Sequence, residues 1–262
     1  MKVTLSLIML ALGAVMGSFL ACQAWRLRYK DTGKAKLGKR SVCLSCKKQL
    51  KWYDNIPIFS WLILRGRCRY CKKKIGAMEI LAEVLLGLAF FGITFMLFPT
   101  GAHSADFVIF GLILALVLVF GFLAIYDGKW GELPSFMLVA ALVIAAVICG
   151  LKIWTIGFSW SMVWNTLGAV AVLGGTYLAL YLVSRGEWVG NGDWILGVVI
   201  GLILGEAWLA LIVLCAANCL GLIVMYPKVR KSKSTKIYFG PFLVVAFVIA
   251  LVFAEFFNGL IF

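Results

Sequence analysis

Long apolar segments, separated by short polar stretches, constrain this chain more than any other feature of its sequence. Residues 107–126 form one such run of about 20 residues, long enough as a helix to cross a hydrocarbon core of about 30 Å. Hydrophobic residues make up 63% of the chain and charged residues 14%, against about 45–50% and 25% in soluble domains. This composition excludes a soluble globular enzyme and a disordered chain, and it predicts an all-α polytopic membrane protein.

The number of membrane crossings depends on how residues 194–226 are divided. The sequence contains eight apolar segments, at 5–25, 79–98, 107–126, 134–154, 162–183, 194–205, 207–226 and 239–261. The sixth, about 18 Å long as a helix, is too short to span alone. A tight turn at Gly205-Glu206 gives eight transmembrane helices and places 23 of the 25 basic residues on the cytoplasmic side. We therefore expect eight helices, with the backbone around 190–193 at membrane depth.

Positive charge is concentrated in two blocks of the sequence. The formal net charge is +14, with 16 basic residues between Arg26 and Lys74 and five between Lys228 and Lys236. Because both blocks lie between apolar segments, the positive-inside rule explains them as cytoplasmic loops. Such loops can meet anionic membrane lipids, and no nucleic-acid partner is predicted. A first helix followed by so basic a block is expected to remain uncleaved.

Two cysteine pairs mark the first polar loop. Cys43 and Cys46 are separated from Cys68 and Cys71 by 21 residues, a spacing that fits a zinc ribbon. Four thiolates suit a closed, structural zinc site, whose binding would supply folding free energy to a small loop. Two disulfides or unliganded thiols are the alternatives, and a cytoplasmic compartment disfavours disulfides. Between the pairs, the aromatic stretch 52–61 suggests a membrane-facing belt.

The remaining four cysteines lie singly in apolar segments. They are expected to be buried, small apolar residues rather than ligands. These are Cys22, Cys149, Cys215 and Cys219.

Two aspartates are informative because acids are costly at membrane depth. Asp127 ends the third apolar segment and Asp193 opens the sixth, so the predicted topology places both at cytoplasmic helix ends. Two carboxylates at one depth suit an aspartyl protease dyad, in which one takes a proton from water and the other polarises the scissile carbonyl. Such a pair shares one proton, because like charges in contact do not both ionise. A proton relay and simple capping of helix ends are the other interpretations.

Four further residues are candidates for binding a substrate. Gly190 and Gly192 remove side chains beside Asp193, which would let an extended substrate backbone come close. Glu79 and Glu83 share one face near the start of the second apolar segment, where the helix dipole favours acids. Glu83 is the deeper of the two and is expected to line a substrate groove.

Four stretches of the sequence resemble the prepilin peptidase family, also called type IV leader peptidases. The second stretch lies between the cysteine pairs, and the fourth is shared with presenilin-like intramembrane aspartyl proteases. The stretches are Gly17-Ser18-Phe19-Leu20 with Arg26-Leu27; 52–61 with Leu64-Arg65-Gly66-Arg67-Cys68; Asp127 with Leu133-Pro134; and Gly190-x-Gly192-Asp193. They spread over residues 17–193, and the cysteine pairs with the 52–67 run are the most specific part.

The resemblance implies a bacterial inner-membrane enzyme with eight membrane helices and its active site facing the cytoplasm. It implies cleavage of the basic leader of type IV prepilins or pseudopilins, with Asp127 and Asp193 as the catalytic pair and the four cysteines of the loop as zinc ligands. Many members also N-methylate the new N-terminus with S-adenosylmethionine. On this basis 1–25 is a first transmembrane helix, 26–78 a cytoplasmic zinc-binding loop domain and 79–262 a transmembrane catalytic domain.

The chain departs from the family pattern at three positions. Trp194-Ile195 follows the aspartate where a lysine is usual at the second place, Ala21 replaces an asparagine, and Ser135 follows Leu-Pro where an acid or asparagine is common. These departures leave N-methylation open but keep the aspartate pair. The alternatives from other classes are a proton-coupled membrane transporter, with acids nearer the bilayer centre and repeated broken helices, and a non-catalytic zinc-loop membrane scaffold.

Overall fold

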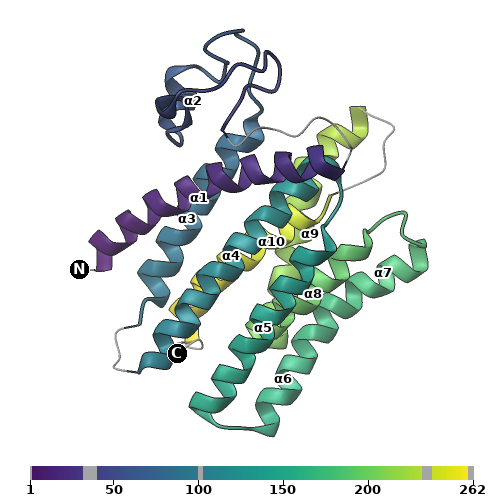
Figure 1. Ribbon diagram of the computed structural model, residues 1–262. Coiled ribbons are helices and arrows are strands. Elements are labelled where there is room, and N and C mark those ends of the chain that lie inside the picture. The colour runs from purple at the N-terminus through teal and green to yellow at the C-terminus, as the bar shows by residue number, and fades with distance from the viewer. Residues whose placement is uncertain (1, 32–39, 100–102, 232–237, 259–262) are drawn as a thin grey trace. The chain divides into compact units, whose positions relative to one another are not determined.

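The computed structural model describes residues 2–31, 40–99, 103–231 and 238–258 (Figure 1). These residues form a multi-pass helical membrane protein with eight apolar helical segments, as the sequence predicts. Six are long and apolar enough to cross a membrane, and the other two are shorter. Part of the second basic block, at 232–236, and the end of the last predicted segment lie outside the described residues.

The apolar helices follow the predicted segments closely. The fifth is one continuous helical run in which α6 and α7 are joined by a π-helical turn, η2, at Ala171–Gly175. The helices are α1 (Lys2–Asp31), α3 (Ala77–Leu97), α4 (Ser104–Trp130), α5 (Ser135–Ile156), α6 (Trp160–Val170), α7 (Thr176–Ser184), α8 (Asn191–Leu204), α9 (Ala207–Lys231) and α10 (Gly240–Asn258).

Contacts divide the chain into two compact units, Met1–Phe95 and Met96–Phe262. The first unit contains α1, α3 and the polar loop between them, with a 3₁₀ turn η1 (Trp52–Asn55) and a short helix α2 (Phe59–Ile63). The cysteine loop therefore belongs to the same unit as the first two apolar helices.

Two glycines let α1 cross closely over α3 in the first unit (Figure 1). A Cβ added to Gly13 would lie 2.5 Å from the carbonyl oxygen of Leu86, and one added to Gly17 would lie 2.7 Å from that of Ala82. Small residues four apart are a common means of bringing membrane helices together. Gly17, which belongs to the first family-like stretch, thus has a packing role.

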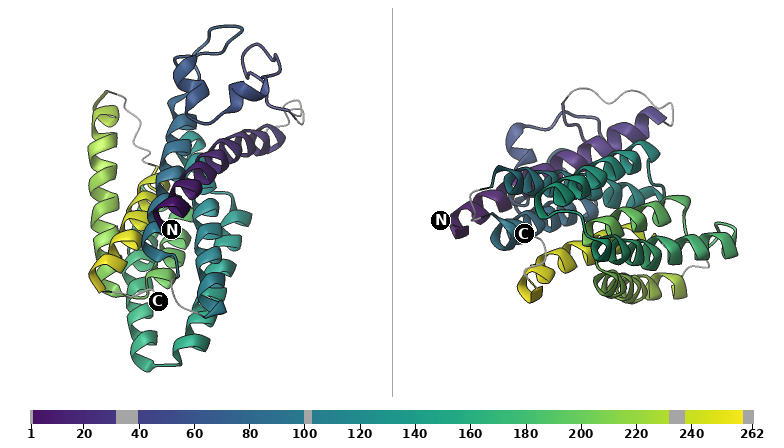
Figure 2. Two further views of the ribbon diagram at one scale, coloured as in Figure 1. Left: turned by 90° about the vertical axis from the view of Figure 1, so that its left-hand side faces the viewer. Right: turned by 90° about the horizontal axis from the view of Figure 1, so that it is seen from below.

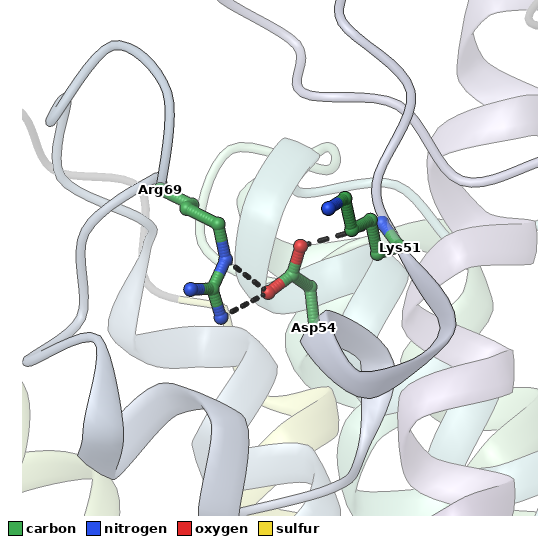
Figure 3. Close-up of polar contacts among 3 residues, drawn as sticks. All are labelled: Lys51, Asp54 and Arg69. Carbon is green, nitrogen blue, oxygen red and sulfur yellow. Dashed lines mark hydrogen bonds and ion pairs between the residues drawn. The ribbon is translucent and has the colours of Figure 1, made fainter.

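An ion pair between Asp54 and the exposed Arg69 organises the loop of the first unit (Figure 3). The Nε and Nη2 atoms of Arg69 lie 2.8 and 2.7 Å from Oδ1 of Asp54, and the backbone N–H of Lys51 donates to Oδ2 at 3.3 Å. The Asp54 side chain is only 2% exposed. These contacts connect η1 to the second pair of cysteines.

In the second unit, α8 is the central helix. It packs against α5, α6, η2, α7, α9 and α10, and Leu196, Val199 and Ile200 are fully buried on it. Figure 1 and the left view of Figure 2 show the helices of this unit side by side. Close approach requires glycine: a Cβ on Gly201 would lie 2.8 Å from the backbone N and Cα of Val170.

The predicted tight turn between the sixth and seventh apolar segments is confirmed. Gly205 ends α8 in the left-handed conformation, with φ of 69° and ψ of −5°, and its N–H donates to the carbonyl of Gly201. Helix α9 begins at Ala207, so only Gly205 and Glu206 connect the two helices.

The prediction that the four single cysteines are buried is wrong. Cys22 and Cys149 are partly exposed, and Cys215 and Cys219 are exposed. On a helix that faces lipid, a small apolar side chain loses nothing by remaining on the surface, because the surroundings are as apolar as a protein core.

We expect Gly201→Ala to lower the thermal midpoint of the detergent-purified protein, because the new methyl group meets backbone atoms of α6 that cannot rotate away. Overpacking of this kind costs about 1–3 kcal/mol. Gly150→Ala in α5 is the matched control, since no described atom lies within 4 Å of its added Cβ. That change should be neutral or stabilising. Equal midpoints for the two variants would contradict the close packing of α8.

Candidate functional site

The two cysteine pairs are held by two turns of the same construction. In the first, the N–H of Cys43 donates to Lys48, the N–H of Lys47 donates back to Cys43, and Val42 pairs with Gln49. Lys47 has a φ of 60°.

The second turn repeats this pattern around Cys68 and Cys71. The N–H of Cys68 donates to Lys73, the N–H of Lys72 donates back to Cys68, and Arg67 pairs with Lys74. Lys72 has a φ of 57°. Two like turns therefore present the two cysteine pairs.

The four sulfur atoms converge on one point. The Sγ atoms of Cys43, Cys46, Cys68 and Cys71 all lie within 4.8 Å of one another, and those of Cys43 and Cys71 are 3.8 Å apart. Four ligands at a zinc–sulfur distance of about 2.3 Å in a tetrahedron stand about 3.8 Å from each other. The geometry therefore fits a closed zinc site, and all eight cysteines are free of disulfides.

Protonation of the thiols is uneven. Burial raises the pKa of Cys43, but hydrogen bonds from the backbone of Cys46 and Ser45, and from neighbouring thiols, outweigh burial and lower this pKa to about 6. The backbone of Lys73 lowers the pKa of Cys71, but burial and the other three thiols outweigh it and raise this pKa to about 11. Binding of a divalent metal to this set would therefore release protons.

The second unit brings Asp127 and Asp193 together. Asp127 lies three residues before the end of α4, and Asp193 is the third residue of α8. Each aspartate is only 5% exposed, and the two carboxyl groups lie close enough for their like charges to repel. Both stand at helix ends rather than at helix centres.

Each carboxyl group accepts a hydrogen bond from the backbone at the start of a helix. Oδ2 of Asp193 accepts from the N–H of Gly190 at 2.9 Å, before α8. Oδ2 of Asp127 accepts from the N–H of Gly240 at 3.0 Å, at the first residue of α10. The positive end of the helix dipole at a helix start favours negative charge. The Oδ2 atom of each acid therefore has a backbone donor, and the Oδ1 atom remains available for another partner.

Sequence reasoning missed Gly240. A Cβ at this position would lie 2.7 Å from Oδ2 of Asp127, so the close approach of backbone and carboxylate requires glycine. Its only sequence signal is Gly240-Pro241 at the start of an apolar run, which is a helix-start pattern. Nothing in that pattern indicates which acid it meets 113 residues away.

Tyr177 was also missed. Its side chain is fully buried in α7, near enough to Asp193 to be influenced by its charge, and its ring packs against Phe239 with the centroids 6.1 Å apart. Among the described residues, the Tyr177 hydroxyl and Oδ1 of Asp193 have no hydrogen-bond partner. The amide of Asn218 also lies near the hydroxyl, but outside hydrogen-bonding geometry.

The site therefore contains one buried donor and one buried acceptor that are both unsatisfied. A water molecule can satisfy both kinds of atom, and a substrate carbonyl oxygen can accept from the tyrosine hydroxyl. Such buried atoms are rarely left without partners in folded proteins.

The glycines beside Asp193 have different surroundings. A Cβ on Gly192 would lie 2.7 Å from Cβ of Leu133, so Leu133 fills the space that Gly192 leaves. This contact joins the two aspartate motifs directly. A Cβ on Gly190 would lie 3.3 Å from Oδ2 of Asp193.

The two glutamates lie together in the first unit and bind its own residues. Oε1 of Glu79 accepts from Nε1 of Trp25 at 3.2 Å. Oε2 of Glu83 accepts from the backbone N–H of Ile58 at 2.7 Å, and Glu83 is buried, with 8% exposed. Glu79 therefore connects α1 to α3, and Glu83 connects the residue before α2 to α3.

Comparison with known proteins identifies the family. Residues 11–97 match the model of the Bacterial Peptidase A24 N-terminal domain. A relative from Aeromonas hydrophila named prepilin leader peptidase/N-methyltransferase is 30% identical over 224 residues, which cover 82% of this chain and 72% of the relative. The chain belongs to the prepilin leader peptidase family.

Two other prepilin leader peptidase/N-methyltransferases illustrate the extent of the similarity. One from Burkholderia pseudomallei is 31% identical over 210 residues, covering 78% of this chain and 64% of the relative. One from Vibrio cholerae is 26% identical over 244 residues, which cover 90% of this chain and 91% of the relative. This chain thus spans 64% of the length of the Burkholderia relative, and no solved structure matches it. The family resemblance read from the sequence is confirmed.

Proposed function

We propose that this member of the prepilin leader peptidase family is an integral-membrane aspartyl endopeptidase. It removes the basic leader from type IV prepilins or pseudopilins at the cytoplasmic face of the bacterial inner membrane. The observation that carries the proposal is the buried pair of Asp127 and Asp193, which come from separate helices and stand within electrostatic range of each other. The names of the relatives support the choice of substrate.

The proposed reaction uses the two carboxyl groups as one acid–base unit that holds a single proton. The ionised carboxylate takes a proton from water as the water oxygen attacks the scissile carbonyl carbon. The protonated carboxyl group keeps its proton and donates a hydrogen bond to the carbonyl oxygen, on which negative charge develops, so the pair then holds two protons. When the C–N bond breaks, the leaving amine takes up a proton from the pair. The other proton remains shared between the aspartates, so the site returns to its starting state.

The positions of the acids favour this reaction over a proton-coupled transporter. A transport path predicts acids near the bilayer centre, whereas both aspartates stand within about one turn of a helix end. Glu79 and Glu83 add negative charge to a unit that is otherwise strongly basic. We propose that they offset its repulsion of a basic leader, and that Gly190 leaves room for the substrate backbone beside Asp193. The space beside Gly192, the other glycine expected to admit substrate, is occupied by Leu133.

The four loop cysteines, in this proposal, hold one structural zinc ion. Zinc would supply folding free energy, and a site closed by four sulfurs leaves no open position for catalysis. The names of the relatives also include N-methyltransferase. N-methylation of the new N-terminus with S-adenosylmethionine is accordingly the second activity to be tested in this protein.

Asp127→Asn and Asp193→Asn should each reduce leader removal at least about 100-fold, the contribution typical of an acid–base group. Asparagine keeps the shape and one acceptor oxygen, so helix capping is preserved. The assay incubates purified protein with prepilin and S-adenosylmethionine and weighs the products, which reports cleavage and methylation together. Asp106→Asn, in the first turn of the same α4, is the control and should retain activity. Full cleavage by either active-site variant would refute the assigned pair.

Tyr177→Phe should lower kcat for leader removal about 10- to 100-fold with little change in KM, as expected for losing one hydrogen bond to a charged group. Phenylalanine keeps the ring contact with Phe239, so the fold is preserved. Tyr181→Phe, one turn further along α7, loses the same hydroxyl and should behave like the unmodified protein. An unchanged kcat in Tyr177→Phe would show that the unsatisfied hydroxyl takes no part.

Purified protein should contain about one zinc ion per chain, as measured by elemental analysis, because four thiolates form one complete tetrahedral site. Cys68→Ser should lose the zinc and lower the thermal midpoint, since Cys68 is buried in the cluster. Cys22→Ser, on α1, should retain both. Disulfides in place of metal, detected by thiol counting after denaturation, would overturn the zinc site.

A further inference from the structure

We propose that α2 together with Trp52 lies in the boundary between lipid headgroups and acyl chains of an anionic membrane, and that Glu83 holds it there. We name Trp52 and Phe59–Ile63 the interfacial anchor. The proposal concerns a surface of the loop and does not depend on the peptidase activity.

The anchor exposes large apolar side chains that belong to no spanning helix. Trp52 is 79% exposed, Phe59 67%, Leu62 56% and Ile63 75%. Single exposed apolar residues are ordinary on protein surfaces, but a contiguous group of them usually marks a surface that contacts a membrane or a partner. Tryptophan is enriched at membrane interfaces because its ring is apolar and its N–H is polar.

A hydrogen bond fixes the depth of the anchor relative to α3. Helix α3 has 21 residues, about 32 Å in length, and so barely crosses a hydrocarbon core of about 30 Å. Glu83 lies six residues after the helix start at Ala77, about 9 Å along its axis. Because Oε2 of Glu83 accepts from Ile58 at 2.7 Å, the residue just before α2 is drawn to the level of the first turns of α3 rather than out into water.

The backbone at Ile58 is held in an unfavourable conformation by this contact. Ile58 has φ of 63° and ψ of −55°, and the N–H of Phe59 donates to the carbonyl of Pro57 at 2.6 Å, which forms a γ-turn of the rare kind. Such a conformation is rare and strained in a β-branched residue, and it persists only where its surroundings enforce it. The buried Glu83 carboxylate enforces it here, and the turn sets the direction in which α2 leaves.

The charge around the anchor matches anionic lipid rather than a basic peptide. Residues 41–76 contain nine Lys and Arg residues and one acid, Asp54, which is already paired with Arg69. Lys51 and Arg65, which flank the anchor, are both exposed. Basic residues near an anionic bilayer are attracted to its surface, whereas the same charges would repel a basic leader.

The test places the photo-reactive amino acid p-benzoyl-phenylalanine at Ile63 in the full-length protein, reconstituted in vesicles of phosphatidylethanolamine and phosphatidylglycerol. After illumination, mass spectrometry should find lipid attached at this position, several-fold more than when the same probe replaces Tyr70 on the second cysteine turn. Vesicles of phosphatidylcholine alone should give less lipid attachment. Attachment only to protein segments or to added prepilin, or equal labelling at the two positions, would overturn the proposal.

The role of Glu83 is tested in the same vesicles. Glu83→Ala should reduce lipid attachment at position 63 several-fold, whereas Glu83→Gln, which retains an acceptor oxygen for the Ile58 N–H, should keep it. Unchanged zinc content shows that the loop is folded in both variants. Equal lipid attachment in the two variants would show that Glu83 does not hold the anchor. Whether the anchor contacts lipid is decided by comparing positions 63 and 70 in the otherwise unmodified protein, however Glu83→Ala folds.

Discussion

The need to satisfy two carboxyl groups inside an apolar helical unit governs the arrangement around Asp127 and Asp193. A buried acid without donors is costly, and here each receives a backbone N–H from the start of a helix, at Gly190 and Gly240. The first bond closes the start of α8 on its own Asp193, and the second connects the start of α10 to Asp127 on α4. Because backbone donors move little, the second oxygen of each carboxyl group has a defined direction in which to meet water.

Close packing through glycines makes that geometry possible. Gly201 lets α8 approach α6, and Gly192 lets the start of α8 meet Leu133, which follows Asp127 in the chain. The π turn at Ala171–Gly175 lies against the same helix and is followed by Tyr177. π turns often occur at functional sites, and here one precedes the buried Tyr177, which lies within electrostatic range of Asp193.

The first unit is stabilised by a different means. The described part of its loop, residues 40–76, has few buried apolar residues. Polar contacts take the place of a core: four convergent thiols, the Asp54–Arg69 pair and the carboxylates of Glu79 and Glu83. A loop held in this way can leave apolar side chains of α2 unburied. These side chains of α2 are therefore available to contact a surface outside the protein.

The sequence by itself determined the features that depend on local spacing. Membrane thickness dictates the length of the long apolar segments, which could therefore be predicted. The short helix and its turn at Gly205 could be predicted from the distribution of basic residues, and the spacing within each cysteine pair identified the cluster. Asp127 and Asp193 were visible because acids are rare in such segments. Only the tertiary structure decided the partners, which are Gly240 for Asp127, Tyr177 beside Asp193 and Ile58 for Glu83. It also decided that Cys215 and Cys219 are exposed. These contacts join residues far apart in the chain, and which pairs meet depends on helix packing rather than on any local pattern.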